Sequence, residues 1–189
     1  MSGVLDHVAI DADLEALLDA DALVIAFPLY VDGLPASLIS LLERYGEIYR
    51  AHRSSSPACS ALPAQRVFAV SNCGFYEGIQ NEGALRMIGH FCRAFALDWC
   101  GGAGIGTGEM VRAVKAVPPE AGIRKPVVGA LRAISAAAGA PGGRLEANLF
   151  VQHGFPWMLY KISGEMGWRK QARANGLRRK DLFARPLMD

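Results

Sequence analysis

The sequence lacks a long hydrophobic run, an excess of charge of one sign and an N-terminal export signal. Its 189 residues include 20 Lys and Arg against 18 Asp and Glu, so the net charge is only +2. This balance gives no reason to expect nucleic acid as a partner. The best apolar run spans residues 22–27, far short of the roughly 20 residues of a membrane span. Residues 1–12 contain two Asp and no basic residue. We therefore expect a cytoplasmic protein without a membrane span.

The sequence also lacks paired cysteines and several familiar motifs. None of the four cysteines forms a Cys-x-x-Cys pair, so reduced thiols are expected. The four histidines are scattered, with no Cys or carboxylate at ligand spacing, which argues against a metal site. No G-x-G-x-x-G, P-loop or G-x-S-x-G pattern occurs, which argues against a dinucleotide fingerprint, a phosphate-binding loop and a nucleophile elbow.

What the sequence does contain is an alternation of apolar runs and amphipathic segments. Strands are predicted over residues 4–10, 23–27, 66–70 and 148–151, and helices over residues 11–20, 35–52, 82–98, 127–138 and 156–175. A shorter segment at 109–117 also has helical character, and residues 53–65 are expected to form a loop. Alternating strands and helices predict an α/β fold with a mostly parallel sheet. We expect a single domain over residues 1–189, in which residues 152–189 form a C-terminal helical extension.

Three small-residue segments each follow a candidate strand: 28–35 (PLYVDGLP), 71–81 (SNCGFYEGIQN) and 101–108 (GGAGIGTG). In doubly wound sheets, ligands bind at the carboxyl ends of the strands. A planar, largely apolar ligand such as a flavin ring would suit these loops, with its face against Tyr30, Phe75 or Tyr76. The alternative is that the glycines serve ordinary turns and that the aromatic side chains cap the core. Cys73 lies in the second loop, and a buried, inert thiol is expected there.

Residues 21–43 (DALVIAFPLYVDGLPASLISLLE) and 66–81 (RVFAVSNCGFYEGIQN) resemble the third and fourth strands and flavin loops of the flavodoxin-fold, NAD(P)H-dependent FMN reductase-like family. Residues 99–108 are similar to that family's next loop. The ending, PWMLYKISGEMGWRKQARANGLRRKDLF, is similar to the C-termini of a bacterial subgroup of flavodoxin family proteins. The resemblance covers nearly the whole chain, and it implies a flavodoxin-like three-layer sandwich.

Residue by residue, the resemblance implies contacts to the flavin ring from Pro28, Leu29, Tyr30, Val31, Asn72, Cys73, Gly74, Phe75 and Tyr76. The implied reaction is transfer of hydride from NAD(P)H through bound FMN to a small-molecule electron acceptor such as a quinone. The cofactor would carry the chemistry, and no catalytic acid or base is nominated. A homodimer is a further expectation from the family.

The sequence departs from this family at its start. Members normally open with a strand and a Ser/Thr-rich loop that holds the FMN phosphate at a helix N-terminus, and this sequence has no such loop. Residues 4–10 look like the family's second strand, with the first strand and helix missing or replaced. Three possibilities stay open: the chain is a fragment, the second strand has moved inward, or a partner chain fills the vacant place.

Three functions compete at this point. An FMN-dependent oxidoreductase would be yellow and would bind FMN. A cofactor-free, flavodoxin-like binding or scaffold protein would be colourless and unaffected by FMN. A quinone or azo reductase completed by a dimer partner would lose activity on dilution. Residues 168–185 carry seven Lys and Arg against one Asp. Such a basic tail suits an acidic partner or membrane surface, although most charge runs are solvated faces.

Overall fold

The computed structural model describes residues 7–178 and 181, with side chains from residue 11 onward. The chain divides into two compact units, Met1–His153 and Gly154–Asp189. The first unit contains the sheet and most of the helices, and the second contains one long helix.

The first unit is built on a four-stranded, all-parallel sheet. Its strands are β1 (Ala22–Pro28), β2 (Arg66–Asn72), β3 (Asp98–Ile105) and β4 (Leu149–Val151), in the spatial order β1-β2-β3-β4. This confirms the predicted α/β class and parallel sheet. Val67, Phe68 and Ala69 in β2 are completely buried, as expected for a central parallel strand with both faces covered.

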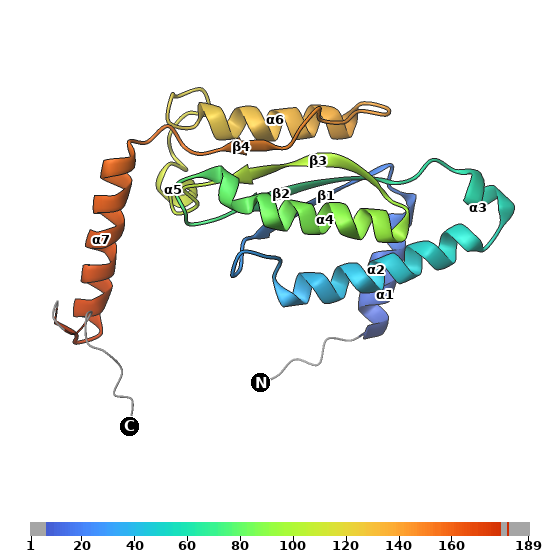
Figure 1. Ribbon diagram of the computed structural model, residues 1–189, viewed down its shortest axis with the longest axis horizontal. Coiled ribbons are helices and arrows are strands. Elements are labelled where there is room, and N and C mark those ends of the chain that lie inside the picture. The colour runs from blue at the N-terminus through green and yellow to red at the C-terminus, as the bar shows by residue number, and fades with distance from the viewer. Residues whose placement is uncertain (1–6, 179–180, 182–189) are drawn as a thin grey trace. The chain divides into compact units, whose positions relative to one another are not determined.

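Helices cover both faces of this sheet, so that the sheet is the middle of three layers (Figure 1). One face contacts α6 (Lys125–Gly139), and the other contacts α4 (Glu82–Phe95), against which α2 (Ala36–Ser54) packs. Each face has its own core. Leu85 and Ile88 of α4 lie in the larger core, and Phe68 packs with Ile134 of α6 in the smaller one. Since the strands are parallel, their carboxyl ends meet at one edge of the sheet.

The predicted strand over residues 4–10 is wrong over residues 7–10, which begin the helix α1 (His7–Ala16); residues 4–6 lie outside the described residues. Ala9, Ala12, Leu14 and Ala16 favour a helix, and the buried Leu14 packs into the larger core. A short 3₁₀ turn, η1 (Leu17–Asp19), then leads to β1. Among the described residues no strand precedes β1, so it lies at an edge of the sheet.

The predicted loop over residues 101–108 is also wrong for its first five residues, because β3 extends to Ile105. Glycine is normally unfavourable in a strand, but here it permits close approach. A Cβ at Gly104 would lie 2.7 Å from the carbonyl oxygen of Gly78, and one at Gly102 would lie 2.9 Å from that of Ala69. Only Gly106, Thr107 and Gly108 remain in the loop after β3.

The remaining elements differ from expectation mainly at their ends. The helix predicted over 82–98 stops at Phe95 because Ala96 takes a left-handed conformation with φ of 57°. The expected loop over 53–65 contains a short helix, α3 (Pro57–Ala61), whose first turn is capped by the Ser56 hydroxyl. The 109–117 segment is helical only over α5 (Met110–Ala113). The turn η2 (Gly78–Asn81) precedes α4.

The second unit consists mainly of α7 (Trp157–Ala174), close to the predicted helix over 156–175. Large apolar side chains are exposed along it, including Met166 at 63% and Trp168 at 71%. Within the described part of the chain, no helix is both long and apolar enough to span a bilayer. Part of the basic segment 168–185 lies outside the described residues.

Candidate functional site at the carboxyl edge of the sheet

Backbone hydrogen bonds join the four strand ends into one continuous edge. The Leu29 N–H donates to the Asn72 carbonyl at 2.8 Å, which ties the loop after β1 to the end of β2. The Cys73 N–H donates to the Ile105 carbonyl at 2.9 Å, and the Gly106 N–H donates to the Val151 carbonyl at 2.8 Å. The loops that follow β1, β2 and β3 therefore form a single surface, at the end of the sheet where α2 and α4 begin (Figure 1).

The loop after β1 is a tight, strained turn that presents apolar side chains to solvent. Tyr30 and Gly33 exchange two backbone hydrogen bonds of 3.0 Å around Val31 and Asp32, whose φ angles are +46° and +59°. Two left-handed central residues define a type I′ turn. A β-branched residue such as Val31 rarely adopts positive φ, and strain of this kind gathers at ligand sites. Val31 is fully exposed, and Tyr30 is 59% exposed.

The loop after β2 is held from beneath by a buried amide. The Asn81 side chain is fully buried, and its Nδ2 donates to the Gly78 carbonyl at 3.0 Å and to the Cys73 sulfur at 3.2 Å. Its Oδ1 accepts from the Ser71 hydroxyl at 2.8 Å. These bonds fix the loop at both ends, and they leave Phe75, 53% exposed, at its outer side. Burial raises the pKa of the Cys73 thiol, in agreement with an inert, protonated cysteine.

The loop after β3 is fixed by a buried pair, Thr107 and His153. The Thr107 N–H donates to Phe75 at 2.6 Å, which connects this loop to the one before it. The Thr107 hydroxyl donates to the Gly106 carbonyl at 2.6 Å and accepts the His153 backbone N–H at 2.9 Å. The His153 Nδ1 lies 3.0 Å from the same oxygen. Burial, aided by the charge of Arg124, lowers the pKa of His153, so the ring is neutral near pH 7.

The nine residues predicted as flavin contacts all lie at or beside this edge, but they do not all face outward. Pro28, Tyr30, Val31, Gly74 and Phe75 are exposed, and Tyr76 is half-buried. Pro28 and Asn72 are the last residues of β1 and β2, where they close the two strands. Leu29 packs against the larger core, and Cys73 is buried. The surface open to a ligand is therefore narrower than the predicted set.

Sequence reasoning missed the buried polar residues that shape the loops. Of the five buried polar residues in the described part of the chain, four belong to this edge: Ser71, Asn81, Thr107 and His153. Thr107 and His153 are separated by 46 positions, so no local pattern pairs them. Ser71 and Asn81 are the first and last residues of the second predicted loop. The available signal was the position of Asn81, an amide directly before the helix that follows β2 and its loop.

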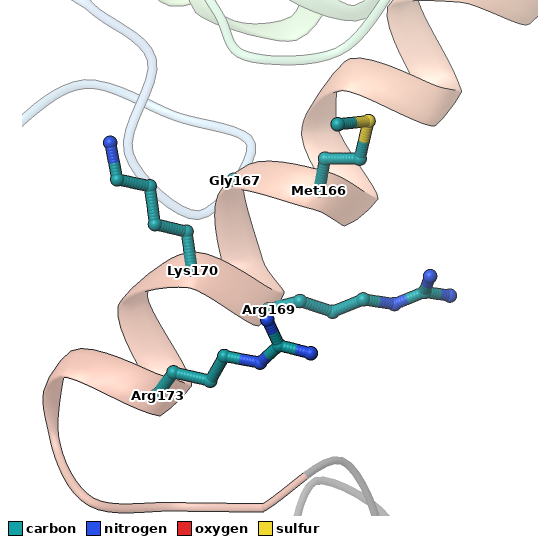
Figure 2. A pocket seen from close by; sticks show the side chains of 5 residues that line it. All are labelled: Met166, Gly167, Arg169, Lys170 and Arg173. Carbon is teal, nitrogen blue, oxygen red and sulfur yellow. The ribbon is translucent and has the colours of Figure 1, made fainter.

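The second unit has a separate depression along α7, with a volume of about 430 Å³. Its described lining consists of Met166, Gly167, Arg169, Lys170 and Arg173. Figure 2 shows Arg169 and Arg173 projecting on the same side of the helix, while Lys170 projects away from them. Arg169 is partly neutralised by Glu165, 3.3 Å away. None of the predicted flavin contacts lines this depression.

Comparison with known proteins identifies no family for this chain. No family model matches it, and no match was found among curated proteins or solved structures. In the described residues, no three His, Cys, Asp or Glu side chains gather as metal ligands would. The site must therefore be interpreted from its own geometry.

Proposed function

We propose that the loops at the carboxyl edge bind the ring of FMN, and that the chain is an FMN-dependent oxidoreductase with a flavodoxin-like sandwich. Hydride from NAD(P)H would pass through the flavin to a small electron acceptor such as a quinone. The observation that carries the proposal is the pair of exposed aromatic side chains, Tyr30 and Phe75, on adjoining loops of a parallel sheet. Apolar surface with a few fixed polar groups is what a planar cofactor requires.

The residues present fit the ring of the cofactor better than its phosphate. Among the described residues, no strand is followed by a Ser/Thr-rich loop. The two hydroxyls closest to the strand ends, Ser71 and Thr107, already donate within the protein. Binding would therefore depend on the ring, and loss of charge-assisted phosphate contacts should weaken it.

The protein's own part in the reaction would be orientation and exclusion of water. Bound flavin supplies the hydride chemistry itself. Tyr30, Val31 and Phe75 would cover apolar ring surface, and the type I′ turn would hold the first loop rigid before binding. Thr107 and His153 bond to each other in the interior, so their role is to position the loop rather than to transfer a proton.

Substitution of the two aromatic residues tests this proposal. Phe75→Ala and Tyr30→Ala should each weaken FMN binding by about threefold to tenfold, as expected for loss of one aromatic contact. The measurement is quenching of FMN fluorescence during titration with protein. Leu62→Ala is the matched control: this residue is 55% exposed and precedes β2 at the opposite end of the sheet. Equal dissociation constants for all four proteins would contradict the proposed site.

A cofactor-free binding or scaffold protein is the second candidate. The observation in its favour is the lack of a phosphate-binding loop in the described residues. It predicts that FMN fluorescence and absorbance stay unchanged when protein is added. The same titration therefore separates the two functions.

A further inference from the structure

We propose that the outer edge of β1 pairs with the same strand of a second copy of this chain, in antiparallel orientation, and joins two sheets into one. Within the described residues, β1 pairs only with β2. Its sequence, ALVIAFP, has no charged residue. The proposal is independent of the flavin site, because the edge concerned runs along the side of the sheet.

The hydrogen bonds of β1 show which of its backbone groups face outward. The Asp21 carbonyl accepts from the Arg66 N–H at 3.2 Å, and the Leu29 N–H donates to Asn72 at 2.8 Å. The backbone N–H and C=O groups of successive residues point to opposite sides of a strand. The odd-numbered residues from 21 to 29 therefore form hydrogen bonds with β2. The N–H and C=O groups of Ala22, Val24 and Ala26 point to the other side, where the described residues provide no strand to receive them.

Apart from its last residue, Pro28, and as far as the described residues show, β1 lacks the features that usually prevent association of an edge strand. Edge strands are commonly protected by lysines, bulges or an early proline. The pairing of β1 with β2 runs without interruption from Ala22 to Pro28, so β1 has no bulge. Pro28 is its last residue, and its missing N–H would point outward, where it costs no bond to β2. Val24 is 50% exposed although β1 is entirely apolar.

A second copy is the occupant that this edge suits best, because the strand is complementary to itself. A two-fold axis near the strand centre would use the same patch on both chains, as closed dimers do. It would set Leu23 near the partner's Phe27, on the face where both residues already pack against the larger core. The charge nearest to the strand, Asp21, would meet the apolar far end of the partner strand. Within the paired strands themselves, no like charges would be brought together.

The test is the mass of the whole chain in solution, measured by sedimentation velocity over a wide range of protein concentration. The unmodified chain should be dimeric. Val24→Lys places a lysine of each copy diagonally across the paired strands, within reach of one another, and should raise the dimer dissociation constant about tenfold or more. Ala26→Pro removes one outward N–H without removing a bond to β2, and it should act in the same direction. Val24→Thr, which keeps a β-branched side chain, should leave the dimer intact.

Two controls separate pairing through β1 from association through another surface and from loss of folding. Leu131→Lys adds a charge at an exposed position of α6, 41% exposed, and should leave the dimer unchanged. Circular dichroism melts of Val24→Lys and Ala26→Pro should show a folded protein. A protein that is monomeric at every concentration would overturn the proposal. This includes a monomer in which another segment of the same chain pairs with the outer edge of β1. A dimer that survives both β1 variants but dissociates with Trp168→Glu would also overturn it, because it would place the interface on α7.

Discussion

At the scale of single residues, the shape of the loops at the carboxyl edge depends on buried polar groups. Asn81 supports the loop that presents Phe75, and Thr107 with His153 supports the next loop. A sequence shows which residues are polar, but burial and partnership arise only when distant segments meet. For this reason the sequence could point to the aromatic residues as candidate site residues, which stays a prediction, while the buried polar residues beneath them were missed.

The buried histidine should make the stability of the fold depend on pH. The pKa of His153 in the folded chain lies below its ordinary value of about 6.5. Between those two values the unfolded chain binds the proton more readily. The free energy of unfolding should therefore fall as the pH drops below about 6.5, until the folded pKa is passed.

Urea denaturation at pH 7.5 and 5.5 measures this effect. His153→Gln, which does not titrate, should lose less stability between the two pH values than the unmodified chain. His90→Gln is the control, because His90 is exposed on α4. An identical pH dependence in all three proteins would show that His153 is not held neutral by the fold.

The cysteines should differ sharply in reactivity. Hydrogen bonds from Ser56 and Ser55 lower the pKa of the half-buried Cys59 thiol, whereas burial raises the pKa of Cys92 to about 12. Because the thiolate is the reactive form, a thiol reagent at neutral pH should modify one cysteine quickly. Cys59→Ser should abolish that fast phase, as measured by reagent absorbance. A fast phase that persists in this variant would assign the reactive thiol elsewhere.

At the scale of elements, close approach decides where glycine is required and where it is not. A methyl group at Gly46 of α2 would lie 2.5 Å from the ring of Phe95 on α4. A methyl group at Gly129 of α6 would meet nothing within 4 Å. Gly46→Ala should thus destabilise the fold by about 1–3 kcal/mol through overpacking, while Gly129→Ala should stabilise it by about 0.5–1 kcal/mol. Urea denaturation of the two variants measures both effects, and destabilisation by Gly129→Ala would contradict this account.

An element could be predicted where its local sequence pattern determines it, and was missed where contacts in the folded chain determine it. Strands β1 and β2 each contain an uninterrupted apolar run, and α2, α4 and α6 repeat apolar residues at helical spacing, so local sequence was sufficient. Residues 101–105 of β3 resemble a loop in sequence because Gly102 and Gly104 carry no strand preference. Glycine is needed at these two positions because the backbone of Ala69 and Gly78 lies too close for a side chain. That proximity exists only in the folded chain. At residues 7–10, helical preference over the whole of α1 prevailed over a local β-rich pattern.

At the scale of the whole molecule, the two proposals concern different parts of the sheet, namely the loops at its carboxyl edge and the outer side of β1. The loops at its carboxyl edge form a connected surface with exposed aromatic side chains. The outer side of β1 offers backbone groups that no described strand receives, on an apolar strand. The flavodoxin-like arrangement, the flavin and the second copy are separate proposals, and each has its own test.

The most direct test of the central claim, that the loops bind a flavin through its ring, is a comparison of FMN with riboflavin. Each flavin is titrated with the unmodified chain, and fluorescence quenching and the visible spectrum give the dissociation constants. Because no phosphate-binding loop is found in the described residues, riboflavin should bind nearly as tightly as FMN, within about threefold, or less than about 1 kcal/mol. No change in the fluorescence or spectrum of either flavin would contradict the claim.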